Sequence, residues 1–216
     1  TAVGGAITVG TVAATDTANF GSLTFNTTGA VSVNENSATE LSAVSTAGSL
    51  VLVSAGAISD GAAGTVTVTG TTSLTAPVAS DITLDNGNDF GGAVTVVSGH
   101  DVVLTDINAI IVGPATASDD LTLTGSTITL VGATITSGSV VDVLPGDATG
   151  EQTYLGPVVL GVDMTLTSLD TGTVTFTGTV NATTSGVEGL AIAGNAVFGN
   201  AAGDFVGNTA ALEFVT

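Results

Sequence analysis

The chain has 216 residues, of which 44% are hydrophobic and 19 are acidic, with one histidine and no lysine or arginine. Because no guanidinium or ammonium group can hold phosphate, we expect neither nucleic acid nor an anionic membrane surface among its partners. A charged fraction of 9% with a mean hydropathy of +0.61 is typical of a chain that forms a core, not of a disordered one.

Cysteine is absent, so the fold cannot depend on disulfides. No run reaches the roughly 18 apolar residues that predict a transmembrane helix. No charged segment followed by an apolar stretch opens the chain, so we expect a processed, excised or incomplete protein. The lack of lysine and arginine removes every trypsin-type cleavage site, which suits a long-lived material. We therefore expect an extracellular or cell-surface location.

Short runs in which apolar residues alternate with threonine or serine predict strands, because successive strand side chains point to opposite faces. In chain order these runs are 51–53, 65–69, 82–84, 94–96, 121–124, 164–167 and 174–177. Turn-forming residues follow the runs, at 70, 85–88, 98–99, 113–114, 125, 170–172 and 178. No sustained helical periodicity occurs, so the sequence predicts an all-β fold.

The pattern also repeats over a longer interval. A shift of about 71 residues relates 20–61 to 90–132 and keeps the phase of the apolar residues. Degenerate repeats of short strands are typical of solenoids. We therefore predict one domain, 1–216, folded as a parallel β-helix of stacked coils. Valine, leucine, isoleucine and phenylalanine are expected to point inward, and threonine, serine and aspartate outward.

An antiparallel β-sandwich is the alternative architecture, as in pilus or surface-layer subunits that polymerise by strand exchange. The segment 198–216 would then be the donated strand. Its apolar residues Leu212, Phe214 and Val215 are the predicted polymerisation edge.

Several segments resemble the repeats of large bacterial exoproteins of the filamentous-haemagglutinin type. They are 82–96, 101–106, 152–161 and 174–178. The resemblance implies a right-handed parallel β-helix that is exported across the outer membrane as part of a very long adhesin or fibre.

Candidates for catalysis are few. The single histidine, His100, lies between Gly99 and Asp101, where we expect an exposed turn residue, and no Gly-x-Ser-x-Gly nucleophile motif occurs. Glycoside hydrolysis needs only two carboxylates. A carboxylate-based glycan hydrolase or glycan-binding β-helix is therefore an alternative, with Asp101, Asp106, Asp119 and Asp120 as the candidate residues. Our main expectation is a protein that is not an enzyme.

One turn carries a candidate metal site. Asp85, Asn86, Asn88 and Asp89 place four oxygen-bearing side chains on five residues, and oxygen is the ligand that calcium prefers. The spacing matches no EF-hand loop, and an ordinary Asp/Asn/Gly turn is the competing interpretation. Calcium is the only cofactor that the sequence indicates.

Threonine pairs at alternate positions would each face one side of a strand. If they stacked on successive coils, they would form a flat face of the kind that ice-binding β-solenoids present. Ice binding is therefore a second functional alternative. The pairs and triplets are 65/67/69, 122/124, 127/129, 134/136, 165/167 and 173/175/177.

Taken together, the sequence predicts a structural or adhesive segment of a secreted or surface fibre that self-assembles into filaments. The end coils of a solenoid expose unpaired backbone, so the expected partners are other copies of the chain or neighbouring repeats of a longer chain. A host or surface ligand is also expected, but the sequence does not identify it.

Overall fold

The computed structural model describes residues 4–10, 18–138, 150–169 and 171–216. These residues hold no helix, and hence none that could cross a membrane. The described strands are β1 (Ile7–Val9), β2 (Ala30–Glu35), β3 (Thr39–Leu41), β4 (Val44–Ala47), β5 (Ser49–Ser54), β6 (Ile58–Asp60), β7 (Thr65–Val68), β8 (Thr72–Thr75), β9 (Ile82–Phe90), β10 (Val94–Ser98), β11 (Val102–Asp106), β12 (Ala109–Thr116), β13 (Leu121–Thr124), β14 (Thr127–Leu130), β15 (Thr134–Ser137), β16 (Gln152–Leu155), β17 (Val158–Leu160), β18 (Met164–Ser168), β19 (Thr173–Phe176), β20 (Val180–Ala182), β21 (Leu190–Ala193) and β22 (Asn195–Phe198).

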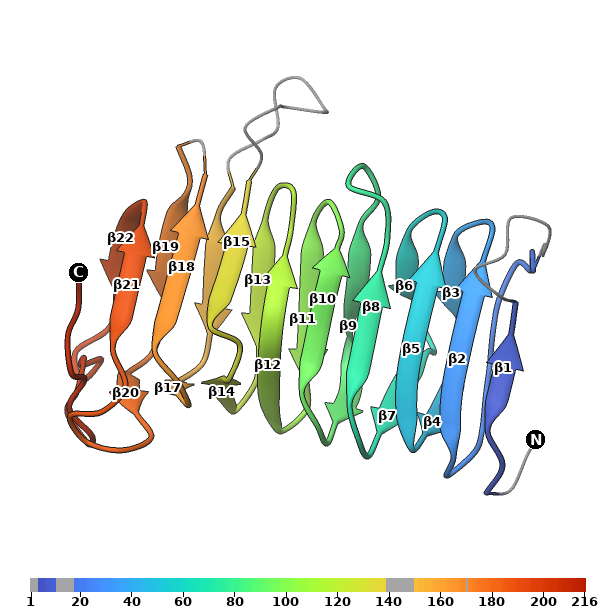
Figure 1. Cartoon of the computed structure of the whole chain (residues 1–216), viewed down its shortest axis with the longest axis horizontal. Coiled ribbons are helices and arrows are strands. Elements are labelled where there is room, and N and C mark those ends of the chain that lie inside the picture. Colours follow the sequence, from blue (N-terminus) through green and yellow to red (C-terminus); the bar gives the residue numbers. More distant parts are fainter. Residues whose placement is uncertain (1–3, 11–17, 139–149, 170) are drawn as a thin grey trace.

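The strands wind into one stack of coils that runs from one end of the molecule to the other (Figure 1). Each named strand pairs in parallel with strands of the neighbouring coils, in a 12-stranded sheet that contains β2, β5 and β8 and a 10-stranded sheet that contains β9, β11 and β13. The predicted parallel β-solenoid is confirmed. The antiparallel sandwich is wrong, because every strand pairing among the described residues is parallel.

The unit that recurs in space is the single coil. Leu50 pairs with Thr72 and Thr72 with Val94, so these coils take 22 residues each, whereas Ile110 and Ile128 are paired at an interval of 18. The 71-residue shift aligns β2 with β11, which lie in different sheets. Both sheets share the two-residue alternation, so a shift that is not a whole number of coils still preserves the apolar phase.

Two predicted turns lie inside strands. Residues 85–88 belong to β9, which pairs with β6 through its first residues and with β7 through its last. Residues 113–114 belong to β12, where the register against β10 shifts between Val112 and Ala115. A β-bulge accommodates the proline there, because the extra residue is left out of the ladder.

One corner of the stack is built from glycines of successive coils. A Cβ at Gly70 would lie 2.5 Å from the carbonyl oxygen of Gly48, and one at Gly92 would lie 2.6 Å from that of Gly70. Side chains at these positions would hold the coils apart. Gly29, Gly48, Gly70 and Gly92 therefore form what we call the glycine column.

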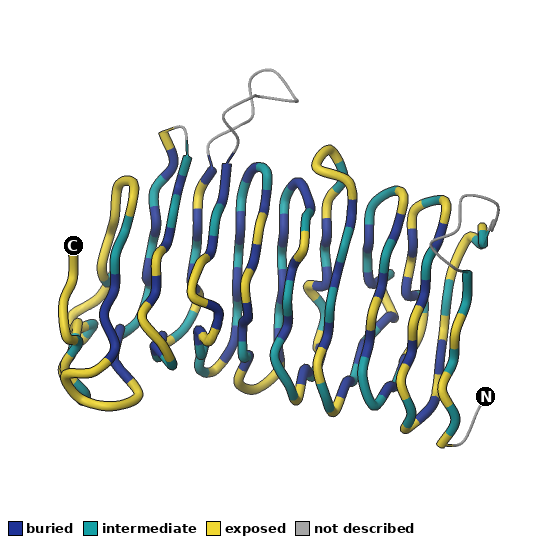
Figure 2. Tube along the Cα trace, viewed as in Figure 1, coloured by how far each residue is buried: buried dark blue, intermediate teal, exposed yellow. Residues whose placement is uncertain are grey.

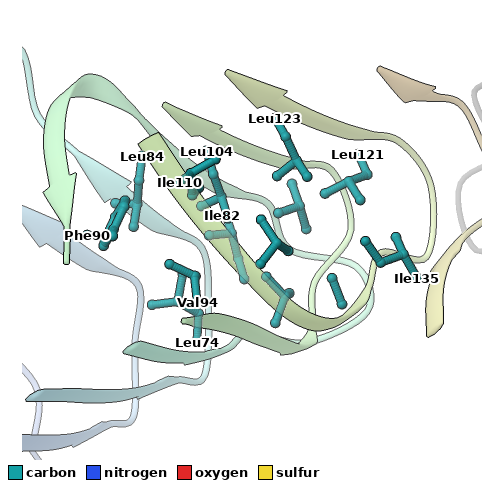
Figure 3. Packing of buried hydrophobic residues seen from close by; sticks show 14 of the residues in the cluster. Leu74, Ile82, Leu84, Phe90, Val94, Leu104, Ile110, Leu121, Leu123 and Ile135 are labelled. Carbon is teal, nitrogen blue, oxygen red and sulfur yellow. The ribbon is translucent and has the colours of Figure 1, made fainter. Parts of the chain in front are cut away.

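The core consists of columns of inward side chains, one from each coil. Figure 3 shows the middle of the stack, where Leu84, Leu104 and Leu123 form a row across the view as register partners on successive coils. The same column continues through Tyr154 and Phe176, both fully buried, to Phe198. Burial alternates along most strands, and the C-terminal end is largely exposed (Figure 2).

Candidate functional site

Four acidic residues stack at one corner, each directly before a strand of the 10-stranded sheet. Asp81, Asp101, Asp120 and Glu151 precede β9, β11, β13 and β16, and we call them the acidic column. Asp81 Oδ1 accepts a hydrogen bond from Asp101 N (3.3 Å), and Asp101 Oδ1 accepts one from Asp120 N (3.2 Å). Asp120 Oδ1 accepts one from Glu151 N (2.8 Å). Each aspartate thereby ties its own coil to the next.

His100 lies behind the acidic column, with its side chain only 5% exposed. The expectation of an exposed turn residue is therefore wrong. Its Nδ1 lies 3.1 Å from Asp81 Oδ1 and 3.6 Å from Asp101 Oδ1, and its Nε2 lies 3.9 Å from Asp119 Oδ2. The ring is buried because the coil that carries Asp119 covers it: Asp119 N donates to the carbonyl oxygen of His100.

The candidate hydrolase residues fall into two groups at opposite ends of β11. Asp101, Asp119 and Asp120 come together, with carboxylate oxygens within 4.8 Å of one another. Asp106 lies at the far end of the strand, where its oxygens accept hydrogen bonds from Phe90 N and Asn108 N, both at 2.8 Å. Burial raises the pKa of both the Asp101 and the Asp106 carboxyl. The hydrolase alternative stays a prediction, with Asp106 outside the cluster.

The candidate calcium residues surround a carboxylate from the preceding coil. Asp60 accepts hydrogen bonds from the backbone nitrogens of Asp85 and Asn86, each at 3.1 Å, and from Asn88 Nδ2 at 2.8 Å. The Oδ1 of the buried Asn88 accepts from Val66 N, so both ends of its amide are engaged.

The side chains of Asn86 and Asp89 also have protein partners. Asn86 Nδ2 donates to carbonyl oxygens, among them that of Gly61 at 2.9 Å, and Asp89 Oδ1 accepts from Asn108 Nδ2 at 3.1 Å. The segment therefore directs hydrogen-bond donors at Asp60. Calcium binding at this corner stays a prediction, and Asp85 is its most exposed candidate ligand.

Buried carboxylates were not expected from the sequence. Glu35, 1% exposed, accepts hydrogen bonds from Phe20 N, from Ser37 Oγ and from Thr39 Oγ1. Asp60 and Asp106 are likewise buried. Because the chain has no lysine or arginine, hydrogen-bond donors of the backbone and of polar side chains compensate these buried carboxylates. A signal was present: the alternation of Val31 and Val33 continues to Glu35, which places it on the inward face.

Threonines stack over short distances on the outer faces. Thr122, Thr153 and Thr175 are register partners on successive coils, and the column continues with Val197. On the other sheet Thr134 pairs with Thr165, beside the column Thr116, Thr136 and Thr167, which continues with Ala193. Ice binding stays a prediction, which thermal hysteresis of the purified chain would test.

At the C-terminal end, an aromatic stack ends on β22, a strand at the edge of its sheet. Tyr154, Phe176 and Phe198 stack at centroid distances of 5.0 and 5.1 Å. β22 pairs only with β19 among the described strands, and Phe198 remains 38% exposed. The predicted edge residues lie on the other sheet: Val215 bridges Leu190, and Leu212 packs on the core. They pair within their own chain.

Residues 28–97 match a family model described as repeats of unknown function (DUF5649). The matched stretch begins just before β2 and ends within β10, so it spans the glycine column. No curated protein and no solved structure matches the chain. The fold and this match define a β-solenoid repeat protein, similar over these coils to that family. The finer filamentous-haemagglutinin resemblance is not identified by these comparisons.

Proposed function

We propose that the chain is a non-enzymatic shaft segment of a secreted or cell-surface fibre or adhesin, and that its coils extend by stacking on further copies of the same fold. A large exoprotein of the filamentous-haemagglutinin type is the finer identity that we propose. The architecture supports this function, because a solenoid makes contacts mainly between neighbouring coils and can therefore be lengthened without changing its core.

The observation that carries the proposal is the surface at the C-terminal end. β22 leaves one edge without a strand partner among the described residues, next to the exposed Val197 and Phe198. An edge strand of this kind is a template for further parallel pairing. A ring stacked on Phe198 would continue the spacing of about 5 Å that the aromatic stack already has.

The surface charge agrees with this mode of assembly. A chain with a net charge of −19 and no lysine or arginine cannot associate through intermolecular salt bridges with its own copies. Backbone ladders and apolar stacking are the attractive forces that it has. We therefore propose that association strengthens with added salt, which screens the repulsion between copies.

Electron microscopy and sedimentation over a concentration series test the proposal. We expect fibres with a strand repeat of about 4.8 Å along the axis. Phe198→Asp should reduce association strongly, whereas Val78→Asp, at a residue 50% exposed away from the C-terminal end, should not. Compact monomers at every concentration and salt level would overturn self-assembly, and strands running along the fibre axis would favour strand exchange instead.

A further inference from the structure

The surroundings of the only histidine go beyond what a shaft requires. One ring nitrogen of His100 and one carboxylate oxygen each of Asp81 and Asp101 lie within 4.8 Å of one another. The closest pairs join His100 Nδ1 to Asp81 Oδ1 and to Asp101 Oδ1. The nitrogen is 3.1 Å from the first oxygen and 3.6 Å from the second. We propose that His100, Asp81 and Asp101 form a binding site for a divalent transition-metal ion, with Zn²⁺ as the test case.

The separations suit direct coordination. Bonds of about 2.0–2.2 Å to a tetrahedral Zn²⁺ place neighbouring ligand atoms roughly 3.3 Å apart. The two distances from His100 Nδ1 lie on either side of that value, so small side-chain adjustments bring all three atoms onto one ion. An imidazole nitrogen among the ligands selects Zn²⁺, Co²⁺ or Ni²⁺ over Ca²⁺ and Mg²⁺, which take oxygen ligands.

The ligand atoms are held in place from the inside and open to solvent on the outside. The buried imidazole ring cannot swing away, and hydrogen bonds from Asp101 N and Asp120 N fix the two carboxylate oxygens. The side chains of Asp81 and Asp101 are 54% and 40% exposed. An ion can therefore enter from solvent, and water can complete its coordination shell.

A second carboxylate stands behind the ring, independently of the acidic column. Asp119 Oδ2 lies 3.9 Å from His100 Nε2, and the Asp119 side chain is 3% exposed. Histidines that bind metals through one ring nitrogen usually direct the other N–H toward a carboxylate, backbone carbonyl or water, which fixes the tautomer and the ring orientation. At 3.9 Å this contact is longer than a hydrogen bond, and Nδ1 is the ring nitrogen that lies within hydrogen-bond distance of a carboxylate, 3.1 Å from Asp81 Oδ1. A metal ion on Nδ1 displaces the proton from that contact, and a small shift of the ring then brings Nε2–H toward Asp119, which acts as a positioning residue for the metal-bound ring.

The electrostatics favour a cation at this corner. Asp81, Asp101, Asp120 and Glu151 follow one another on successive coils, and the chain offers no lysine or arginine to compensate them. A divalent ion between the first two would reduce the repulsion along the acidic column. Binding should therefore also hold the coils of β9 and β11 together.

Calorimetric titration of the EDTA-treated, dialysed full chain with ZnCl₂ tests the proposal. We expect saturable binding with one ion per chain and a higher melting temperature. Bound Co²⁺ should give a visible absorption spectrum, and added Zn²⁺ should abolish it by displacing the Co²⁺ ion. Because the chain has a single histidine, the ¹⁵N shifts of its ring nitrogens report on this site alone, and Zn²⁺ should move the Nδ1 resonance most.

Variants separate the site from general acidity. Asp81→Asn and His100→Asn should each weaken Zn²⁺ binding about 10-fold or more. Asp119→Asn should weaken it about 10-fold and change the Nε2 shift of the Zn²⁺-bound ring. Glu40→Gln removes one exposed carboxylate charge from another coil and should leave the affinity unchanged. The proposal is overturned if Zn²⁺ does not bind, if the ring resonances do not move, or if Asp81→Asn behaves like Glu40→Gln. Asp81 is exposed, so its variant remains informative if His100→Asn fails to fold.

Discussion

Two neighbouring strands of the same sheet, β19 and β22, have nearly the same inward pattern but very different burial. Val174 and Phe176 of β19 are fully buried, whereas their register partners in β22, Ala196 and Phe198, are exposed. The difference is visible at the C-terminal end of the stack in Figure 2. Burial in a solenoid is thus supplied by the coils on both sides of a strand and not by the strand's own sequence.

The comparison predicts different costs for the same truncation. Phe176→Ala removes a ring packed between Tyr154 and Phe198 and should lower the free energy of unfolding by about 3–5 kcal/mol. Phe198→Ala removes a ring covered on one side only, and its cost should be about 1–2 kcal/mol. Denaturant unfolding followed by circular dichroism measures both. Equal losses would contradict the role that we give to the neighbouring coils.

A second substitution in the same aromatic stack should cause a smaller loss in the free energy of unfolding. Tyr154→Phe keeps the aromatic stack but removes the hydroxyl that donates to Gln152 Oε1 at 2.8 Å. Both side chains are fully buried, so the amide oxygen would lose its partner, at a cost of about 1–3 kcal/mol.

A double variant provides the control. Gln152→Leu combined with Tyr154→Phe removes both polar partners and should recover part of the loss measured for Tyr154→Phe alone. If the single variant unfolds at the same denaturant concentration as the wild type, the buried hydrogen bond contributes nothing to stability.

The strands of both regions could be predicted from the sequence, because alternation is a local signal. The run 121–124 has the observed bounds of β13, and 164–167 and 174–177 fall within one residue of β18 and β19 at each end. Inward columns of leucine, isoleucine and valine follow from the same alternation. The parallel stacking could be inferred from the shortness and repetition of the runs.

Coil register could not be predicted, since coils of 18 and 22 residues occur in the same stack. The glycine column was a usable signal that the alternation alone does not contain: Gly48, Gly70 and Gly92 are spaced by one coil each. The burial of His100 depends on the coil that carries Asp119, so no local pattern around Gly99 could reveal it. For the same reason the sequence did not reveal that His100, Asp81 and Asp101 come together.

The middle of the stack offers a test in the stabilising direction. Thr72 points into the core between its register partners Leu50 and Val94, and its hydroxyl is buried without a hydrogen-bond partner. Thr72→Val removes this unsatisfied group with little change of shape and should raise the free energy of unfolding by about 1 kcal/mol.

Thr39→Val is the matched control. The Thr39 hydroxyl is equally buried but donates to Glu35 Oε2 at 2.6 Å, so its removal should destabilise the protein. Chemical denaturation of the two variants under identical conditions gives the comparison. The opposite signs are the prediction, and two losses would show that packing outweighs hydrogen bonding at Thr72.

The smallest expected effect is on pH dependence, and it arises in the enclosed middle of the stack. Neighbouring coils bury Asp106, and this burial raises the pKa of its carboxyl above 3.8 despite two backbone hydrogen bonds that lower it. A carboxyl whose pKa is raised on folding stabilises the folded state when it is protonated. The contribution of Asp106 to stability should therefore increase as the pH falls through the raised pKa toward 3.8, and be lost as the pH rises.

Titration of the Asp106 carboxyl by ¹³C NMR checks the direction, and a midpoint at or below 3.8 would contradict it. Asp106→Asn should flatten the pH dependence of unfolding in this window.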